Sequence, residues 1–319
     1  FQLKNIEKAE NYFNKLSEMN YNLTIPYAAI GLYYYEIKKF EKALKYLALV
    51  EDKSDNIKIF NALADIYNKT GDAVSAEKYY LKLYSMHPSE EYAVAAAKFF
   101  DANNNSNKAA EFYKIAVKYN PENMEALYFL GNLYFNLKNY QNAAGYLNSL
   151  SKIRHSYEKI NEKLAKSYFE INEFDKCAEL YNKIGNRNQI QNFEYAYSLM
   201  KSKKYADSLV QFNNLLLEKQ IAPKLKSDIL RYAAETYLNS GNKIDGELIQ
   251  YYNNFIRNIA ENKITDKESL DYLDNISVKT GDFYYELKEY SKSYHYYSFV
   301  KNFGSQTSNS IEKFAIAAF

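Results

Sequence analysis

The sequence has 319 residues, of which 47% are hydrophobic and 25% charged, and its formal net charge is +2. This hydrophobic content excludes a disordered chain, and the balanced charge gives no electrostatic footprint for a nucleic-acid backbone or an anionic membrane. With 9 Gly and 4 Pro the chain lacks the turn residues of an all-β fold, and no apolar run approaches the roughly 18 residues that span a bilayer. We therefore expect a soluble helical protein that has no transmembrane segment and binds no nucleic acid.

The first predicted element is a helix containing Ala9, Phe13 and Leu16. In the repeating two-helix unit described below, it fits a second helix whose first helix is mostly missing. From Gly31 a short frame recurs: a small residue lies three positions before a large one, at intervals of about 33 to 34 residues as far as Ala165. These small–large pairs are Gly31/Tyr34, Ala64/Tyr67, Ala97/Phe100, Gly131/Tyr134, Ala165/Tyr168, Ala196/Leu199, Ala234/Tyr237 and Gly281/Tyr284. The regular intervals predict a repeat protein.

A second small residue follows each first one by about twelve positions, and a bulky residue usually lies four positions beyond it. The second small residues are Ala43, Ala76, Ala109, Ala143, Cys177, Ser208, Gly246 and Ser293. Small residues on two antiparallel helices let their axes approach to about 8–10 Å, and large residues fill the space beside them. We expect most of the 35 tyrosines to lie in this core, with their hydroxyls directed to water or a backbone carbonyl.

The segment from Gln220 to Lys279 departs from the period. It holds a long helical pattern from Lys243 to Asn262 and a new helix start at Thr265, which with Glu268 fits a capping box. An insertion of about a dozen residues is expected to lengthen the helices here, and plain loop variation is the alternative. A good copy of the frame returns over 281–300, and Ile311 to Phe319 fits a first helix that has no partner after it.

This frame resembles the tetratricopeptide repeat family, whose unit has Gly or Ala then Tyr in its first helix, Ala then Phe or Tyr in its second, and a closing Pro. The closest match runs from Ile57 to Pro88 and contains Ala64, Tyr67, Gly71, Ala76, Tyr80 and Pro88. The resemblance implies an all-α fold, a right-handed α-solenoid of stacked helix–turn–helix repeats, with about eight units plus partial units at both ends. We expect a single superhelix over 1–319, with regular repeats over 1–218, an irregular repeat with an insertion over 219–280, and the last repeat and terminal helix over 281–319.

The sequence offers no basis for an enzyme, and we expect no cofactor or metal. His87, His155 and His295 are far apart and lack ligand-like neighbours, so packing or surface roles are favoured. Cys177, the only cysteine, occupies one of the small-residue positions, which predicts a buried structural thiol and not a nucleophile.

The resemblance also implies that the first helices line a concave groove that binds peptides or partner helices. The residues expected to face it are Asn61, Asp65, Asn68, Tyr128, Asn132, Phe135, Lys159, Lys166, Phe169, Phe193, Tyr197, Met200 and Arg231. Relatives that grip a C-terminal carboxylate use Lys and Asn one turn apart, whereas Asn61/Asp65 and Tyr128/Asn132 stand at the corresponding places here, so that role is disfavoured.

The aromatic middle of this groove suits an apolar helix or extended peptide, and Lys159 and Lys166 beside it would match acidic flanks. Alternatively, the rings cover one another in a shallow groove. We predict a protein–protein interaction scaffold with Phe193 and Tyr197 as anchors. The alternatives are an RNA-binding helical repeat, or the regulatory or anchoring part of a larger envelope or signalling protein.

The predicted location is the cytoplasm, because a single cysteine suits a reducing compartment. A periplasmic or envelope-associated location stays open, since the sequence begins at Phe1 and not at Met.

Overall fold

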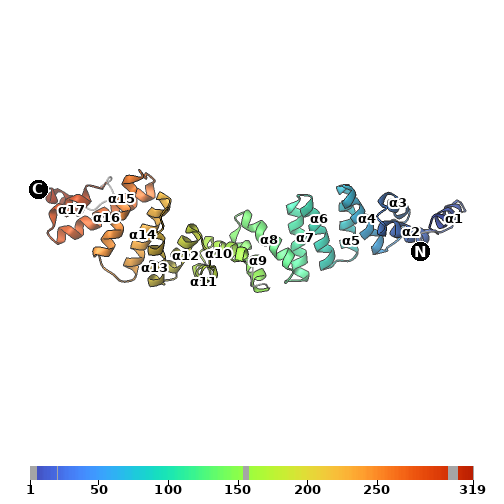
Figure 1. Cartoon of the computed structure of the whole chain (residues 1–319), viewed down its shortest axis with the longest axis horizontal. Coiled ribbons are helices and arrows are strands. Elements are labelled where there is room, and N and C mark those ends of the chain that lie inside the picture. The colour runs from blue at the N-terminus through green and yellow to red at the C-terminus, as the bar shows by residue number, and fades with distance from the viewer. Residues whose placement is uncertain (1–5, 20, 154–157, 301–307, 319) are drawn as a thin grey trace. The chain divides into compact units, whose positions relative to one another are not determined.

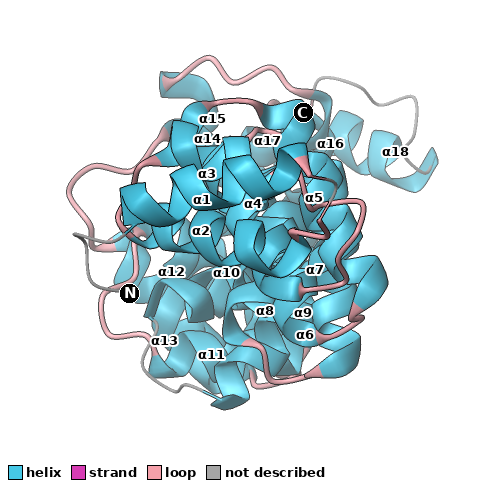
Figure 2. Ribbon diagram, turned by 90° about the vertical axis from the view of Figure 1, so that its right-hand side faces the viewer, coloured by secondary structure: helices cyan, strands magenta, loops and turns pink. Residues whose placement is uncertain are grey.

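A computed structural model describes residues 6–19, 21–153, 158–300 and 308–318, and every regular element in these ranges is an α-helix (Figure 1). The chain divides into two compact units, Phe1–His155 and Ser156–Phe319. Figure 2 shows how uniformly the described part consists of helices joined by short loops. The all-α class is confirmed, and the arrangement as one superhelix stays a prediction.

The first unit contains nine helices among its described residues. They are α1 (Ile6–Glu18), α2 (Thr24–Glu36), α3 (Phe40–Leu47), α4 (Ile57–Thr70), α5 (Ala73–Met86), α6 (Glu90–Ala102), α7 (Ser106–Tyr119), α8 (Met124–Asn136) and α9 (Tyr140–Ile153). Successive helices pack as pairs, α2 with α3, α4 with α5, α6 with α7 and α8 with α9, and neighbouring pairs pack in turn. This is the stacked helix-pair architecture that the sequence predicts.

The described residues of the second unit repeat this plan. They form α10 (Glu158–Glu170), α11 (Phe174–Lys183), α12 (Gln189–Lys201), α13 (Tyr205–Leu216), α14 (Pro223–Asn239), α15 (Gly246–Glu261), α16 (Lys267–Glu286), α17 (Tyr290–Tyr297) and α18 (Ser308–Ala317). The pairs are α10/α11, α12/α13, α14/α15 and α16/α17. Across both units the described residues thus hold eight helix pairs, with α1 and α18 outside them.

The small residues of the frame lie where the two helices of a pair touch. A Cβ atom placed on Gly31 would lie 2.6 Å from Leu47 Cδ2, and one on Gly281 would lie 2.7 Å from a ring carbon of Tyr297. Such contacts leave no room for a side chain, so the bulky residue predicted four positions after the second small residue fills the space beside the glycine.

Serine replaces alanine at two of these crossings without leaving a buried polar group unpaired. Ser208 Oγ donates to the Ala196 carbonyl at 2.8 Å, and Ser293 Oγ donates to the Gly281 carbonyl at 2.8 Å. Each serine therefore ties its helix to the partner helix.

The turn inside most pairs has one fixed backbone geometry. Lys138, between α8 and α9, has φ 56°, and the N–H of Asn139 donates to the Tyr134 carbonyl at 2.9 Å. Gly71 adopts the same left-handed region, with φ 84°. This is a Schellman-type helix end, in which a left-handed residue lets the chain reverse and satisfies a free helix carbonyl.

The irregular stretch contains lengthened helices, as expected: α14, α15 and α16 have 17, 16 and 20 residues, against 13 in each of α8, α10 and α12. Two details of the prediction are wrong. Gly246 is exposed at the first position of α15 with no atom near its Cβ position, so it is not a crossing residue. The start of α16 is capped by Asp266, whose side chain accepts from the Ser269 N–H at 3.0 Å, and not by Thr265 with Glu268.

Tyrosine fills much of the core, as the repeat frame predicts. Tyr34, Tyr181, Tyr252 and Tyr297 are among the largest fully buried side chains. Several hydroxyls donate to carboxylates, which differs from the expected water or carbonyl partners: Tyr181 to Glu194 at 2.5 Å and Tyr35 to Asp65 at 2.8 Å. A carboxylate accepts such a bond more strongly than a carbonyl does.

At the ends, α1 contains the predicted Ala9, Phe13 and Leu16, and α18 packs against α16 and α17. The predicted last helix includes Phe319, which lies outside the described residues. Within the described ranges, no helix combines the length and apolarity that crossing a membrane requires.

Candidate functional site

The predicted groove residues of the first unit lie on α4 and α8. On α4, Asn61 and Asn68 are exposed, while Asp65 accepts from the Tyr35 hydroxyl and pairs with Lys69 at 2.6 Å. The i,i+4 ion pair and the tyrosine hold the Asp65 carboxylate in place.

On α8, Tyr128 is 53% exposed, and the Asn132 amide donates to its carbonyl at 2.7 Å. The Phe135 ring lies edge-on to Tyr140, with 5.7 Å between centroids. Tyr128 is therefore the more exposed of these two aromatic residues.

The predicted lysines of the second unit differ in their surroundings. Lys159 is exposed on α10. Lys166 is held by two carboxylates, Glu194 at 2.5 Å and Glu170 at 2.7 Å, and its ammonium lies 5.1 Å from the centre of the Phe169 ring. Because both acids neutralise Lys166, it offers little free charge to the acidic flanks expected from the sequence.

Four predicted residues come together in the second unit. Phe169, Phe193, Tyr197 and Arg231 line one hollow of about 320 Å³. The rest of its lining is Glu170, Asn172, Phe174, Asp228, Tyr232 and Glu268. Met200, by contrast, is buried at 4% exposure, so its side chain does not belong to this surface.

The aromatic side chains of the hollow form one connected cluster. Tyr197 lies at its centre, with ring centroids 5.7 Å from both Phe169 and Phe174 and 4.8 Å from Tyr232. Phe193 stands 6.2 Å from Tyr197. The tilted and edge-on arrangements are the favourable ones for aromatic pairs. The rings thus cover one another in part, as one alternative held, and also form the walls of the hollow.

Arg231 closes one side of the hollow. It pairs with Glu268, donates to the Tyr232 hydroxyl, and places its guanidinium carbon 4.4 Å from the centre of the Tyr232 ring. Its own side chain is 12% exposed, whereas that of Glu268 is 62% exposed. Burial raises the pKa of Asp228, and the charges of Lys224 and Arg231 act against this rise.

The sequence prediction missed Asp228, Tyr232 and Glu268 among the lining residues, and only Asp228 follows directly from helix geometry. Asp228 lies three residues before Arg231 on α14 and therefore on the same helix face, which counting by helical turns would have found. Tyr232 is beside Arg231 in sequence but is turned inward by its ring contacts. Glu268 belongs to the first turn of the lengthened α16, beyond the reach of a frame counted from Gly281.

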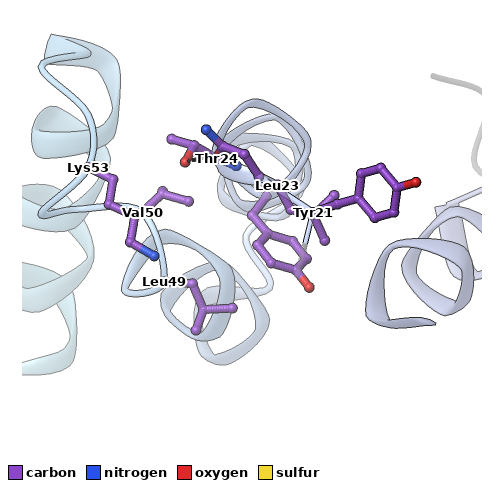
Figure 3. A pocket seen from close by; sticks show the side chains of 8 residues that line it. Tyr21, Leu23, Thr24, Leu49, Val50 and Lys53 are labelled. Atoms are coloured by element: carbon purple, nitrogen blue, oxygen red, sulfur yellow. Dashed lines mark hydrogen bonds between the residues drawn. The ribbon is translucent and has the colours of Figure 1, made fainter. Parts of the chain in front are cut away.

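A second hollow, of about 590 Å³, lies in the first unit between the start of α2 and the end of α3. Figure 3 shows Leu49 and Val50 of its wall, while the ring of Tyr21 points away from them. Lys53 is its charged residue, and none of the predicted groove residues lines it.

Cys177 is fully buried, and burial raises the pKa of its thiol to about 12, as expected for a structural cysteine. His87 and His295 are exposed and belong to different units, and His155 lies outside the described residues. The described part of the chain brings no three His, Cys, Asp or Glu side chains together in a way that could hold a metal ion.

Comparison with known proteins gives two sequence matches. Residues 57–90 and 94–153 each match the tetratricopeptide repeat family. No curated protein matches the sequence.

Several solved structures are similar at low sequence identity. The chain is 17% identical to MamA AMB-1, which covers 50% of this chain and 89% of its own, with a TM-score of 0.41. A tetratricopeptide repeat protein from Parabacteroides merdae ATCC 43184 is 17% identical over 73% of this chain and 98% of its own, with a TM-score of 0.40. The structure of Naa15/Naa10 bound to HypK-THB is 15% identical, covering 93% of this chain and 51% of its own, with a TM-score of 0.48.

The two sequence matches identify tetratricopeptide repeats in the first unit. They cover α4 with α5 and then the stretch from α6 to α9, which are consecutive helix pairs of the first unit. The same small-residue crossing recurs in the second unit at Gly281 against Tyr297. The first unit of the chain therefore contains tetratricopeptide repeats, over residues 57–90 and 94–153.

Proposed function

We propose that this protein is a non-enzymatic scaffold that holds a segment of another polypeptide in the hollow of the second unit. One observation carries the proposal: Phe169, Phe193, Tyr197 and Arg231, contributed by α10, α12 and α14, line the same hollow. Tetratricopeptide repeat proteins in general are non-catalytic scaffolds for protein interactions, which is consistent with this use.

The character of the lining supports a peptide ligand. Aromatic residues and arginine dominate the residues that carry binding energy at protein interfaces, because they bury a large rigid surface and retain polar contacts. Phe193 and Tyr197 are half-buried, so each keeps ring surface that a partner would cover. Covering such surface contributes about 25 cal/mol for each Å² removed from water.

The test compares two matched double variants as baits in a pull-down from source lysate. Phe193→Ala/Tyr197→Ala removes the proposed anchors, and Tyr128→Ala/Phe135→Ala removes two aromatic residues from α8 in the first unit. The first variant should lose a partner that the second and the wild type recover, with circular dichroism confirming that all three are folded. Recovery of every partner at the same level by the anchor variant would show that this site is wrong.

A further inference from the structure

The charged side chains that line the hollow are mostly acidic. Glu170, Asp228 and Glu268 line it against one cation, Arg231. The guanidinium of Arg231 is already engaged by Glu268 and the Tyr232 hydroxyl and is mostly covered, while Glu268 reaches into solvent. A ligand that enters therefore meets carboxylate oxygens before it meets the guanidinium.

The aromatic walls are of a kind that accepts cations. Two ammonium groups of the chain itself lie on these rings: Lys166 at 5.1 Å from the centre of Phe169, and Lys201 at 5.1 Å from the centre of Tyr197. A ring face attracts a cation, most strongly where water is excluded, and the aliphatic stem of a lysine or arginine packs against the same rings.

We propose that the hollow receives a lysine or arginine side chain of the bound segment, its stem against Tyr197 and Phe174 and its charge toward Glu268 and Asp228. This inference rests on the proposed function and specifies the chemistry of the partner. The sequence alone led us to expect acidic residues in the ligand, opposite Lys159 and Lys166. The proposed ligand residue is basic instead, because Lys166 is neutralised within the chain.

The partially buried carboxylate of Asp228 agrees with this choice. Burial raises its pKa, and its nearest lysine, Lys224, stands 3.6 Å away. A cation placed in the hollow would add a favourable charge to a carboxylate that has lost part of its hydration. An acidic ligand would instead place a like charge against Glu268, which is 62% exposed while its cation Arg231 is 12% exposed.

The experiment is a selection of displayed dodecapeptides on the full chain, followed by titration of individual synthetic peptides. Peptides that occupy the hollow are identified by loss of affinity with Tyr197→Ala but not with Tyr119→Ala, the matched change of a tyrosine that is 50% exposed on α7 and lies outside the predicted groove. Each Lys or Arg in these peptides is then replaced by norleucine, which keeps the stem and removes the charge.

We expect one basic position whose replacement weakens binding about tenfold or more. In the Glu268→Gln variant the same replacement should weaken peptide binding clearly less, because the two charges are coupled. Glu125→Gln is the control, since Glu125 also lies in the first turn of a first helix, α8, and pairs with Lys98 at 2.8 Å. It should leave the affinity unchanged.

The outcomes separate this inference from the function on which it rests. Hollow-dependent peptides anchored by an acidic or uncharged residue would overturn the basic ligand and leave the scaffold function standing. Selected peptides that all ignore Tyr197→Ala would overturn the site itself and this inference with it. If Tyr197→Ala does not fold, Glu268→Gln decides alone, because an unchanged effect of norleucine in that exposed variant contradicts the proposal.

Discussion

Gly131 of α8 lies directly against Leu147 of α9, so that a Cβ atom on Gly131 would stand 2.6 Å from Leu147 Cδ2. Gly145 of α9 is also a helical glycine, but nothing lies within 4 Å of its Cβ position. Two glycines in one helix pair therefore have opposite roles, one forced by packing and the other free.

Substitution of these glycines by alanine should have opposite effects. Gly131→Ala forces Leu147 to move and should lower the free energy of unfolding by about 1–3 kcal/mol. Gly145→Ala removes the conformational cost of glycine in a helix and should raise it by up to about 1 kcal/mol. Urea unfolding followed by circular dichroism measures both, and equal effects would contradict the packing role of Gly131.

Glu194 should be a strong determinant of stability in the second unit. Glu194 is 4% exposed, and its carboxylate accepts from the Tyr181 hydroxyl and pairs with Lys166. Glu194→Ala leaves that hydroxyl without its acceptor and should cost about 2–4 kcal/mol.

Glu170→Ala is the matched control, because it removes the exposed partner of the same lysine at 2.7 Å. That pair should contribute about 0.5 kcal/mol or less. Equal losses in the two variants, measured by urea unfolding, would contradict the distinction between the buried and the exposed acid.

The stability of the fold should fall at alkaline pH through buried tyrosines such as Tyr252. Burial raises the pKa of Tyr252 to about 12 from its ordinary value of 10.0, and the charge of Glu235 acts in the same direction. The unfolded chain therefore loses this proton first, so the stabilisation is complete below pH 10 and is lost as the pH rises toward 12.

Tyr252→Phe removes one of the groups whose deprotonation causes this loss. The slope of the unfolding free energy against pH should therefore become less steep by up to about 1.4 kcal/mol per pH unit. Urea unfolding at pH 8, 9, 10 and 11 measures the slope. Below pH 9 the difference between variant and wild type should stay constant, because the phenol is protonated in both states. A slope identical to that of the wild type would contradict the burial of this hydroxyl.

Cys177 should resist alkylation until the second unit unfolds. Its thiol is fully buried and accepts from Ser198 Oγ at 3.2 Å, and burial raises its pKa to about 12. At pH 8 the reagent therefore cannot reach the sulfur, and the thiol is not deprotonated. Iodoacetamide labelling, followed by mass spectrometry along a urea series, should track unfolding.

The control for this experiment moves the thiol to the surface. Serine occupies the position equivalent to Cys177 in α13 and α17, so Cys177→Ser should be tolerated, and Ser85→Cys adds an exposed thiol on α5. The double variant should be labelled without urea. Rapid labelling of the wild type would show that Cys177 is accessible.

The sequence predicts the helix pairs well because each crossing leaves few choices of residue. Only a small side chain fits against Leu47, Leu147 or Tyr297, so a small residue at that spacing indicates a helix crossing. At Gly246 the same pattern fails, since the longer helices of that pair place the glycine at a helix start instead of a crossing.

The hollow could be predicted only in part. Phe193 and Tyr197 follow from helical spacing, but the pairing of Lys166 with Glu194 joins residues of different helices and changes the net charge that a ligand meets. Glu268 lines the hollow from α16, which is longer than the regular repeat period predicts. The chemistry of the site therefore depends on contacts between units of the repeat, which a pattern within one unit cannot show.

The contact of Gly131 with Leu147, like those of Gly31 with Leu47 and Gly281 with Tyr297, joins positions only about sixteen residues apart. Each helix pair thus closes a short loop, and its formation does not wait for a distant part of the chain. We expect folding to be fast and to begin during synthesis, with each pair docking on the preceding pair of its own unit as it leaves the ribosome.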